Sequence, residues 1–417
     1  MKNLTFSKIS ISVAALALLA VFGLAGCGGG GGGGGSSTTP PVTSAGGTVD
    51  MNGVTVVIPA NAIDSGLNVS ITATTEDNLP GIAPAGSTVA SKTVVLTKSS
   101  SYNFNEPVQV TMPYSDTLLD TGDVPGIFYW DDTAKLYRAA GVKNIDSTNK
   151  TITFSTVHFS KFVALGVKGL AKKLGIAENS TPAIIPAADS GFRANTDGFF
   201  HRNFGAYDAP GGSCLGMANF SVWYYTTMKQ SNSNTGLYTM YKEGDATRWE
   251  DDVTARELIS RAFMVSSQTW AKTWMATEYK LGSDLTGLMI ITALQITDAP
   301  MPFLMSDQWP GMTSGHAAVV YKYDTNKFYI YDDNFPGEEV TIDWAIDPAT
   351  KKYKFSNYTK NAAYSPSFNH FFFEGLSTAA EANQYQILYD GAKDKFSSGS
   401  RFSKITINSA VDSKNNN

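Results

Sequence analysis

The sequence predicts a multi-domain fold in which an all-β sandwich precedes an α+β domain. Between residues 46 and 166, short runs of alternating apolar and polar residues are separated by turn residues, which is typical of a sandwich. Beyond residue 196, apolar residues first recur at helical spacing and then gather in short strand-like runs. Helices followed by an antiparallel sheet are expected of an α+β domain.

Ahead of both domains, residues 1–26 predict a secretory signal. Lys2 and Lys8 supply positive charge, and the uncharged stretch from Ile9 to Leu24 is short for a spanning helix, which needs ~20 apolar residues. The stretch ends in Leu-Ala-Gly-Cys27, which resembles the bacterial lipobox. This resemblance implies that Cys27 is lipidated and becomes the mature first residue; a chance cysteine in an ordinary signal is the alternative.

Residues 27–45 predict a flexible tether. Gly28 to Gly35 run without interruption into serine, threonine and proline, a composition that cannot build a core. No later segment is apolar and long enough to span a bilayer. We therefore expect an exported protein held by its lipid at the bacterial cell envelope, on the outer membrane or the cell surface, since Gly28 replaces the aspartate associated with inner-membrane retention.

The composition of the chain limits the classes of binding partner that we expect. The chain has 417 residues, of which 42% are hydrophobic and 17% charged, enough for two ordinary domains. The formal net charge is −5 and Lys and Arg form no cluster, so nucleic acid is not an expected partner. The composition leaves the oligomeric state open.

Five segments of the first region resemble the ZU-type domain of ankyrins and netrin receptors. They are Gly46-Gly47-Thr48, Ile58-Pro59-Ala60-Asn61-Ala62, Pro107-Val108, Phe128-Tyr129-Trp130-Asp131 and Val157-His158-Phe159-Ser160. The resemblance covers most of residues 46–166 and implies a structural or interaction module, with His158 in a structural role. Residues 167–195, rich in proline and small residues, are expected to link this module to the next domain.

The second domain is expected at residues 196–375, followed by a polar extension at 376–417. Apolar residues between Ala255 and Phe263 fall on one helical face, and a further helix is predicted from Asp284 to Ile296. The predicted strands are Phe303–Met305, His316–Tyr323, Phe328–Tyr331 and Phe371–Phe373, with a hairpin turn at Asp324–Lys327.

Cys214 is the candidate nucleophile. With Cys27 lipidated it is the single remaining cysteine, whereas exported proteins usually pair their cysteines. Gly211-Gly212-Ser213 precede it and an apolar stretch follows, so Ser213 is expected to cap a helix that begins at Cys214. A helix N-terminus stabilises a thiolate, although a lone cysteine can also be an inert core residue.

The partners for such a thiol follow in order. His316 heads a predicted strand after glycine, and Asp332 ends the next one, so a hairpin would bring both to the same sheet edge. This order resembles the papain-like cysteine peptidases, above all the double-glycine leader peptidase branch. The resemblance implies Cys214 as nucleophile, His316 as general base and Asp332 as orienting group, with Asn334 in reserve for the third role.

One position departs from that family. The branch usually carries glutamine six residues before the cysteine as an oxyanion donor, and here the position is Asp208, whose carboxylate cannot donate unless protonated. The backbone N–H of Cys214, with Asn203, is left for that role. His201 and His370 are alternative bases, and Asp333 is expected to be a solvated turn residue.

No metal centre or other cofactor is expected, because four histidines scattered over the chain do not form a zinc-binding cluster. The sequence thus predicts a membrane-anchored surface lipoprotein whose papain-like domain cleaves peptide or amide bonds, with peptides or peptidoglycan stems as substrates. The alternative is a non-catalytic binding or adhesion lipoprotein with a degenerate papain-like domain, which the departure at Asp208 favours.

Overall fold

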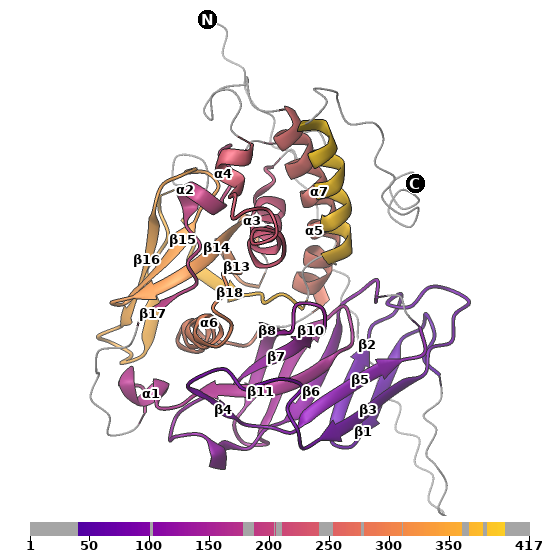
Figure 1. Cartoon of the computed structure of the whole chain (residues 1–417). Helices are drawn as coiled ribbons and strands as arrows, with labels where there is room; N and C mark the ends of the chain where they lie inside the picture. The colour runs from indigo at the N-terminus through magenta and orange to yellow at the C-terminus, as the bar shows by residue number, and fades with distance from the viewer. Residues whose placement is uncertain are drawn as a thin grey trace, which may run out of the picture. The chain divides into compact units, whose positions relative to one another are not determined.

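The structure is a computed structural model of the chain (Figure 1). It describes residues 41–100, 103–177, 187–203, 205, 211–241, 253–276, 279–310, 312–360, 367–377 and 382–396. The predicted secretory signal, Cys27 and most of the tether lie outside the described residues, and so does Asp208.

The N-terminal region consists of antiparallel β-sheets, as the alternating pattern predicts. Its strands are β1 (Gly47–Met51), β2 (Val54–Ile58), β3 (Ile71–Glu76), β4 (Ser87–Val89), β5 (Thr93–Lys98), β6 (Val108–Pro113), β7 (Gly126–Asp131), β8 (Leu136–Ala139), β9 (Gly141–Asp146), β10 (Thr151–Thr156) and β11 (Lys161–Val167), with a 3₁₀ turn η1 (Asp116–Leu118) after β6. One sheet has the order β1-β2-β6-β10-β9, and the other β3-β5-β11-β7-β8, with β4 also paired to β11.

The two sheets share one apolar core. Along β6, Val108, Val110 and Met112 are buried while the residues between them are half-buried, which is the period of two that a one-sided strand requires. Phe154 of one sheet and Phe162 of the other meet with ring centroids 4.7 Å apart. The inward side chains of both sheets therefore pack face to face, as in a sandwich.

Helices dominate the middle of the chain. They are α1 (Leu170–Lys173), α2 (Ala194–Asp197), α3 (Cys214–Trp223), the π-helical turn η2 (Tyr224–Met228), α4 (Leu237–Met240), α5 (Val253–Ala276) and α6 (Ser283–Thr297). The helices predicted around residues 255–263 and 284–296 correspond to α5 and α6. The predicted linker, residues 167–195, contains α1 and the short strand β12 (Ala188–Asp189).

A third antiparallel sheet forms the C-terminal region. Its strands are β13 (Met301–Ser306), β14 (Gly315–Asp324), β15 (Lys327–Tyr331), β16 (Val340–Ile346), β17 (Tyr353–Phe355) and β18 (His370–Phe373), in the order β17-β16-β15-β14-β13-β18, and β12 pairs with β14. The predicted hairpin turn joins β14 to β15, where Thr325 and Asn326 have φ of 47° and 63°. Two consecutive positive φ values are typical of a type I′ turn. The sequence patterns do not predict β16 and β17.

This C-terminal sheet curls into a nearly closed barrel. Tyr358 follows the edge strand β17, Phe368 precedes the opposite edge strand β18, and the two residues form an antiparallel bridge. Each N–H donates to the other's carbonyl oxygen, at 2.8 Å from Tyr358 to Phe368 and at 3.0 Å in return. The bridge therefore joins extensions of the sheet's two edges.

Helix α3 is buried on all sides, packing against β13, β14 and α5 (Figure 1). At Gly216 a Cβ atom would lie 2.2 Å from the backbone nitrogen of Phe263, so glycine is what allows α3 and α5 to approach this closely. The helix cannot shift along its axis without disturbing these contacts. Its first residue, Cys214, is thereby fixed relative to the sheet.

Within the predicted polar extension, α7 (Ala382–Phe396) packs against α5 and α3. Tyr385, Leu388, Tyr389 and Ala392 are buried, at the spacing of one helical face. Sequence analysis does not anticipate this helix, because polar residues separate its apolar positions. None of the helices among the described residues has the length and apolar character needed to cross a bilayer.

Candidate active site

Cys214 is the first residue of α3 and a half-buried free thiol. Ser213 occupies the N-cap position as predicted, but its hydroxyl makes no capping hydrogen bond. The side chain of Asn203 caps the preceding turn instead, because its Oδ1 accepts the Ser213 N–H at 2.5 Å. Asn203 also lies 2.8 Å from where a Cβ of Gly212 would stand, and Gly212 has φ of +114°, so this turn requires glycine.

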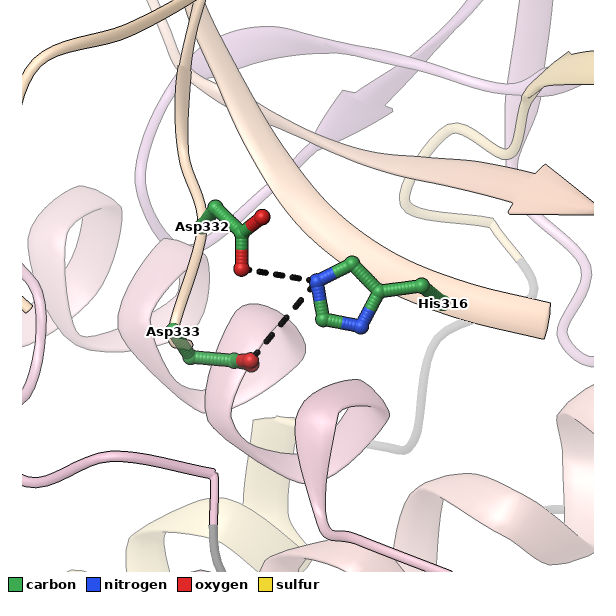
Figure 2. Close-up of side chains that lie close together, drawn as sticks. All are labelled: His316, Asp332 and Asp333. Atoms are coloured by element: carbon green, nitrogen blue, oxygen red, sulfur yellow. Dashed lines mark hydrogen bonds and ion pairs between the residues drawn. The ribbon is translucent and has the colours of Figure 1, made fainter. Parts of the chain in front are cut away.

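His316 and Asp332 meet as the hairpin predicts. His316 is the second residue of β14 and Asp332 follows the last residue of β15, and their side chains are 4% and 0% exposed. His316 Nε2 lies 2.8 Å from Asp332 Oδ1 (Figure 2). This hydrogen bond fixes the ring and leaves Nδ1 as the nitrogen available to a nucleophile.

Asp332 is held by two further donors. The backbone N–H of Asn334 donates to Oδ1 at 2.9 Å, and the hydroxyl of Tyr358 donates to Oδ2. Asn334, the reserve candidate for the third role, therefore contributes a backbone group to Asp332. Asp332 is the residue whose side chain hydrogen-bonds the imidazole.

The electrostatics of the pair favour an ion pair. Burial by itself would lower the pKa of His316, but the charge and hydrogen bond of Asp332 and a hydrogen bond with the Cys214 side chain hold this pKa well above its usual value. Burial would raise the pKa of Asp332, but His316, Tyr358 and the Asn334 N–H keep it below its usual value. The protonated imidazole and the ionised carboxylate stabilise one another.

Asp333 is not the solvated turn residue that the sequence predicts. Its side chain is 1% exposed, and Oδ1 lies 3.8 Å from His316 Nε2 (Figure 2). Neither carboxyl oxygen has a hydrogen-bond partner within the described part of the chain. Burial, opposed by the charge of His316 and reinforced by that of Asp332, raises the pKa of Asp333 to about 8. Asp333 is therefore mostly protonated at neutral pH, which leaves Asp332 as the single negative charge facing the imidazole.

Asn203 and the backbone N–H of Cys214 are the two candidate donors to an oxyanion. Asn203 lies beside the start of α3, and its backbone N–H donates to the Asp333 carbonyl oxygen at 3.0 Å, which links it to the His316 side of the site. The N–H of Cys214 is one of the first-turn donors that a helix leaves unpaired. Asp208 lies outside the described residues, so the structure does not describe its side chain.

The alternative histidines have other surroundings. The Nδ1 of His370 interacts with Asn369 at 2.5 Å, and the buried ring of His201 packs edge-on against Phe200. His158, in the sandwich, packs against Tyr129 and Phe162. His316, by contrast, has an interaction with Cys214 that contributes to its raised pKa.

Three side chains here offer metal ligands. One atom each from His316, Asp332 and Asp333 lie within 4.8 Å of one another. Two ligands of a tetrahedral zinc ion stand roughly 3.4 Å apart, given bonds of about 2.1 Å. An ion would therefore have to force apart the His316–Asp332 pair, now at 2.8 Å. The present geometry fits a hydrogen-bonded dyad better than a metal centre.

Sequence reasoning misses two residues that contact this dyad. Tyr358 donates to Asp332, and the ring of Phe368 lies parallel to that of His316, at 11° with centroids 6.1 Å apart. Both follow from the closure of the barrel. No spacing in the sequence predicts that closure. The predicted strands indicate only that a sheet with two edges forms in this region.

Comparison with known families supports the assignment of the first region. The family model of the ZU5 domain matches residues 38–122, which agrees with the resemblance in the first part of residues 46–166. The matched segment ends well before Cys214. No curated protein matches the chain.

Proposed function

We propose that this chain is a lipid-anchored protein of the bacterial cell envelope whose C-terminal half is a papain-like cysteine hydrolase. One observation carries the proposal: His316 Nε2 lies 2.8 Å from Asp332 Oδ1, and Cys214, at the start of a buried helix, contributes to the raised pKa of the same imidazole. A thiol, an imidazole and a carboxylate in this order are the groups that nucleophilic catalysis requires.

The chemistry follows from the geometry. Cys214 Sγ attacks the carbonyl carbon of an amide as the thiolate, its proton having already passed to His316 Nδ1. The tetrahedral oxyanion collapses, the C–N bond breaks, and His316 gives the proton to the leaving amine. His316 then takes a proton from water, whose oxygen attacks the thioester; the C–S bond breaks, the acid leaves, and the Cys214 thiolate is restored beside protonated His316.

Asp332 stabilises the imidazolium that forms in each half of this cycle and keeps Nδ1 directed at the thiol. The N–H of Cys214, together with Asn203, is the proposed oxyanion site. Peptides are the leading substrate class, with peptidoglycan stems and acyl transfer to an amine as variants that the same triad serves. The ZU5 region acts as an interaction or spacer module, and the Gly/Ser tether connects it to a lipid on Cys27 that is held in the membrane.

The rate of Cys214 alkylation by iodoacetamide tests the site. In a full chain carrying Cys27→Ser, Cys214 is the single cysteine. An ordinary thiol is less than about 1% thiolate at pH 6. If His316 accepts the proton, we expect alkylation at pH 6 at least about tenfold faster than that of an ordinary thiol.

His316→Ala should return that rate to the ordinary value, whereas the matched variant His370→Ala should leave it unchanged. A rapid reaction that depends on His316 justifies screening peptide libraries for cleavage. Slow alkylation in the parent chain, or indifference to His316→Ala, would overturn the hydrolase proposal.

A non-catalytic binding lipoprotein is the second candidate, favoured by Asp208 in the position of the family's glutamine. It predicts peptide or glycan binding that survives Cys214→Ser, without turnover by the parent chain. Lipidation is tested separately, by incorporation of an alkyne-labelled fatty acid in bacteria. Cys27→Ser should abolish the label, and a label that persists would contradict the proposed anchor.

A further inference from the structure

We infer that Tyr358 and Phe368, the pair whose bridge brings the two edges of the C-terminal sheet together, are positioning residues for the His316–Asp332 dyad. The inference deepens the proposed function and rests on it for the consequence in catalysis. The placement of the dyad itself can be measured without any activity.

The two carboxylate oxygens of Asp332 have different donors. Oδ1 accepts from His316 and from the Asn334 N–H, whereas among the described residues Oδ2 accepts only from Tyr358. Asp332 is fully buried, so water cannot substitute for a missing donor. Without the Tyr358 hydroxyl, Oδ2 would be a buried acceptor with no donor and the carboxylate could rotate about its Cβ–Cγ bond. The hydroxyl therefore fixes which oxygen faces the imidazole.

The ring of His316 lies beside the ring of Phe368. The ring of Phe368 is 0% exposed and lies nearly parallel to the imidazole, with an interplanar angle of 11°. This flat apolar wall, whose ring centroid lies 6.1 Å from that of the imidazole, limits the room in which the imidazole can rotate about its Cβ–Cγ bond.

The bridge links the residue that contacts the carboxylate to the residue that packs beside the imidazole. Tyr358 and Phe368 exchange both backbone hydrogen bonds, at 2.8 and 3.0 Å, so a shift of one backbone moves the other. One residue of the pair holds the carboxylate and the other packs on the base. Closing the barrel and aligning the dyad are thus accomplished by the same contact.

The test is Tyr358→Phe in the full chain, which removes the hydroxyl and keeps the ring. Tyr353→Phe is the matched control, because Tyr353 is also a buried tyrosine of the β17 edge but stacks on Trp344, with centroids 4.2 Å apart. The Nε2–H proton of His316 in NMR spectra reports the hydrogen bond to Asp332. We expect this resonance to move upfield or broaden in Tyr358→Phe and to remain in Tyr353→Phe.

Kinetics provide the second readout. Tyr358→Phe should slow His316-dependent alkylation of Cys214 about tenfold, which is the scale for a lost hydrogen bond to a charged group. The acid limb of the pH profile should move to higher pH, because the Tyr358 hydrogen bond helps to keep the pKa of Asp332 low. A purely structural role would lower the melting temperature without moving this limb.

The outcomes are distinct. If Tyr358→Phe matches Tyr353→Phe in both readouts, the positioning inference is wrong while the hydrolase proposal stands. If the Nε2–H resonance changes but Cys214 behaves as an ordinary thiol in the parent chain, the positioning inference stands and the hydrolase proposal fails. Should Tyr358→Phe not fold, Phe368→Leu keeps the bridge and removes the flat wall. It should broaden the imidazole resonance, and an unaltered resonance would overturn the inference.

Discussion

The sandwich and the C-terminal sheet each enclose a histidine among aromatic rings, with opposite effects. His158 packs against Tyr129 and Phe162 with ring centroids 4.8 and 6.4 Å away, and burial lowers its pKa to about 4. His316 packs on Phe368 at 6.1 Å, yet its pKa is held well above the usual value. Similar aromatic surroundings therefore do not decide the charge of a histidine.

The carboxylate facing each ring makes the difference. Asp332 lies 2.8 Å from His316 Nε2, whereas Asp131, the carboxylate that acts on His158, pairs with Arg138 at 2.6 Å. His158 is therefore mostly neutral at neutral pH, whereas His316 is mostly protonated. The charge of a buried histidine thus depends on whether a buried acceptor is directed at its ring.

Asp332→Asn should have the largest effect, because it removes the charge that distinguishes the surroundings of His316 from those of His158. The amide keeps the shape but removes the charge, so the pKa of His316 should fall below its usual value, as that of His158 does. We expect His316-dependent reactions of Cys214 to slow by about three to four orders of magnitude, the scale for loss of the orienting carboxylate in a triad. An NMR titration of His316 together with alkylation rates checks this. A reactivity within tenfold of the parent would mean that Asp332 is not the orienting group.

A smaller effect should appear in the sandwich. Because the pKa of His158 is lowered to about 4, folding favours its neutral form, and this stability is present above pH 6.5 and lost as the pH falls toward 4. We expect urea unfolding of the parent chain to reveal a loss of about 1–3 kcal/mol over this interval. His158→Phe should lack most of that loss, and His370→Phe should retain it. Equal pH dependence in all three chains would contradict the role given to burial.

Asp333→Asn should give the smallest change and sharpen the contrast between the two carboxyls. The pKa of Asp333 is raised to about 8, so the native state keeps a proton that the unfolded chain loses, and stability falls as the pH rises from about 4 to 8. An amide resembles the protonated acid and should unfold like the parent at pH 5. At pH 9 we expect it to melt a few degrees higher. A variant less stable than the parent at pH 9 would show that Asp333 is ionised in the native state at no cost.

Local patterns predict much of this fold. The strands of the sandwich follow from alternating apolar residues, α3 begins at Cys214 after its glycines, and the β14–β15 hairpin places His316 beside Asp332. Each of these depends on residues close together in the chain. Spacing and turn chemistry therefore suffice to predict them.

The remaining features depend on contacts that no local pattern encodes. The Ser213 hydroxyl makes no cap, and its backbone N–H is instead bound by Asn203, ten residues earlier. Asp333 is buried although it lies in a polar turn, and its carbonyl oxygen accepts the N–H of the distant Asn203. Tyr358 reaches Asp332 only because the barrel nearly closes. Tertiary contacts override the polarity of the surrounding sequence in all three cases.

The closure of the C-terminal sheet also bears on how an extended chain could be recognised. An open sheet edge presents unpaired N–H and carbonyl groups, which can add a further strand from a peptide or from another molecule. Here the bridge between Tyr358 and Phe368 engages backbone groups from both edges. Strand addition is thereby restricted at this seam, which reduces the risk of edge-to-edge aggregation. At this seam an extended peptide therefore has fewer free backbone groups to pair with than it would have at an open sheet edge.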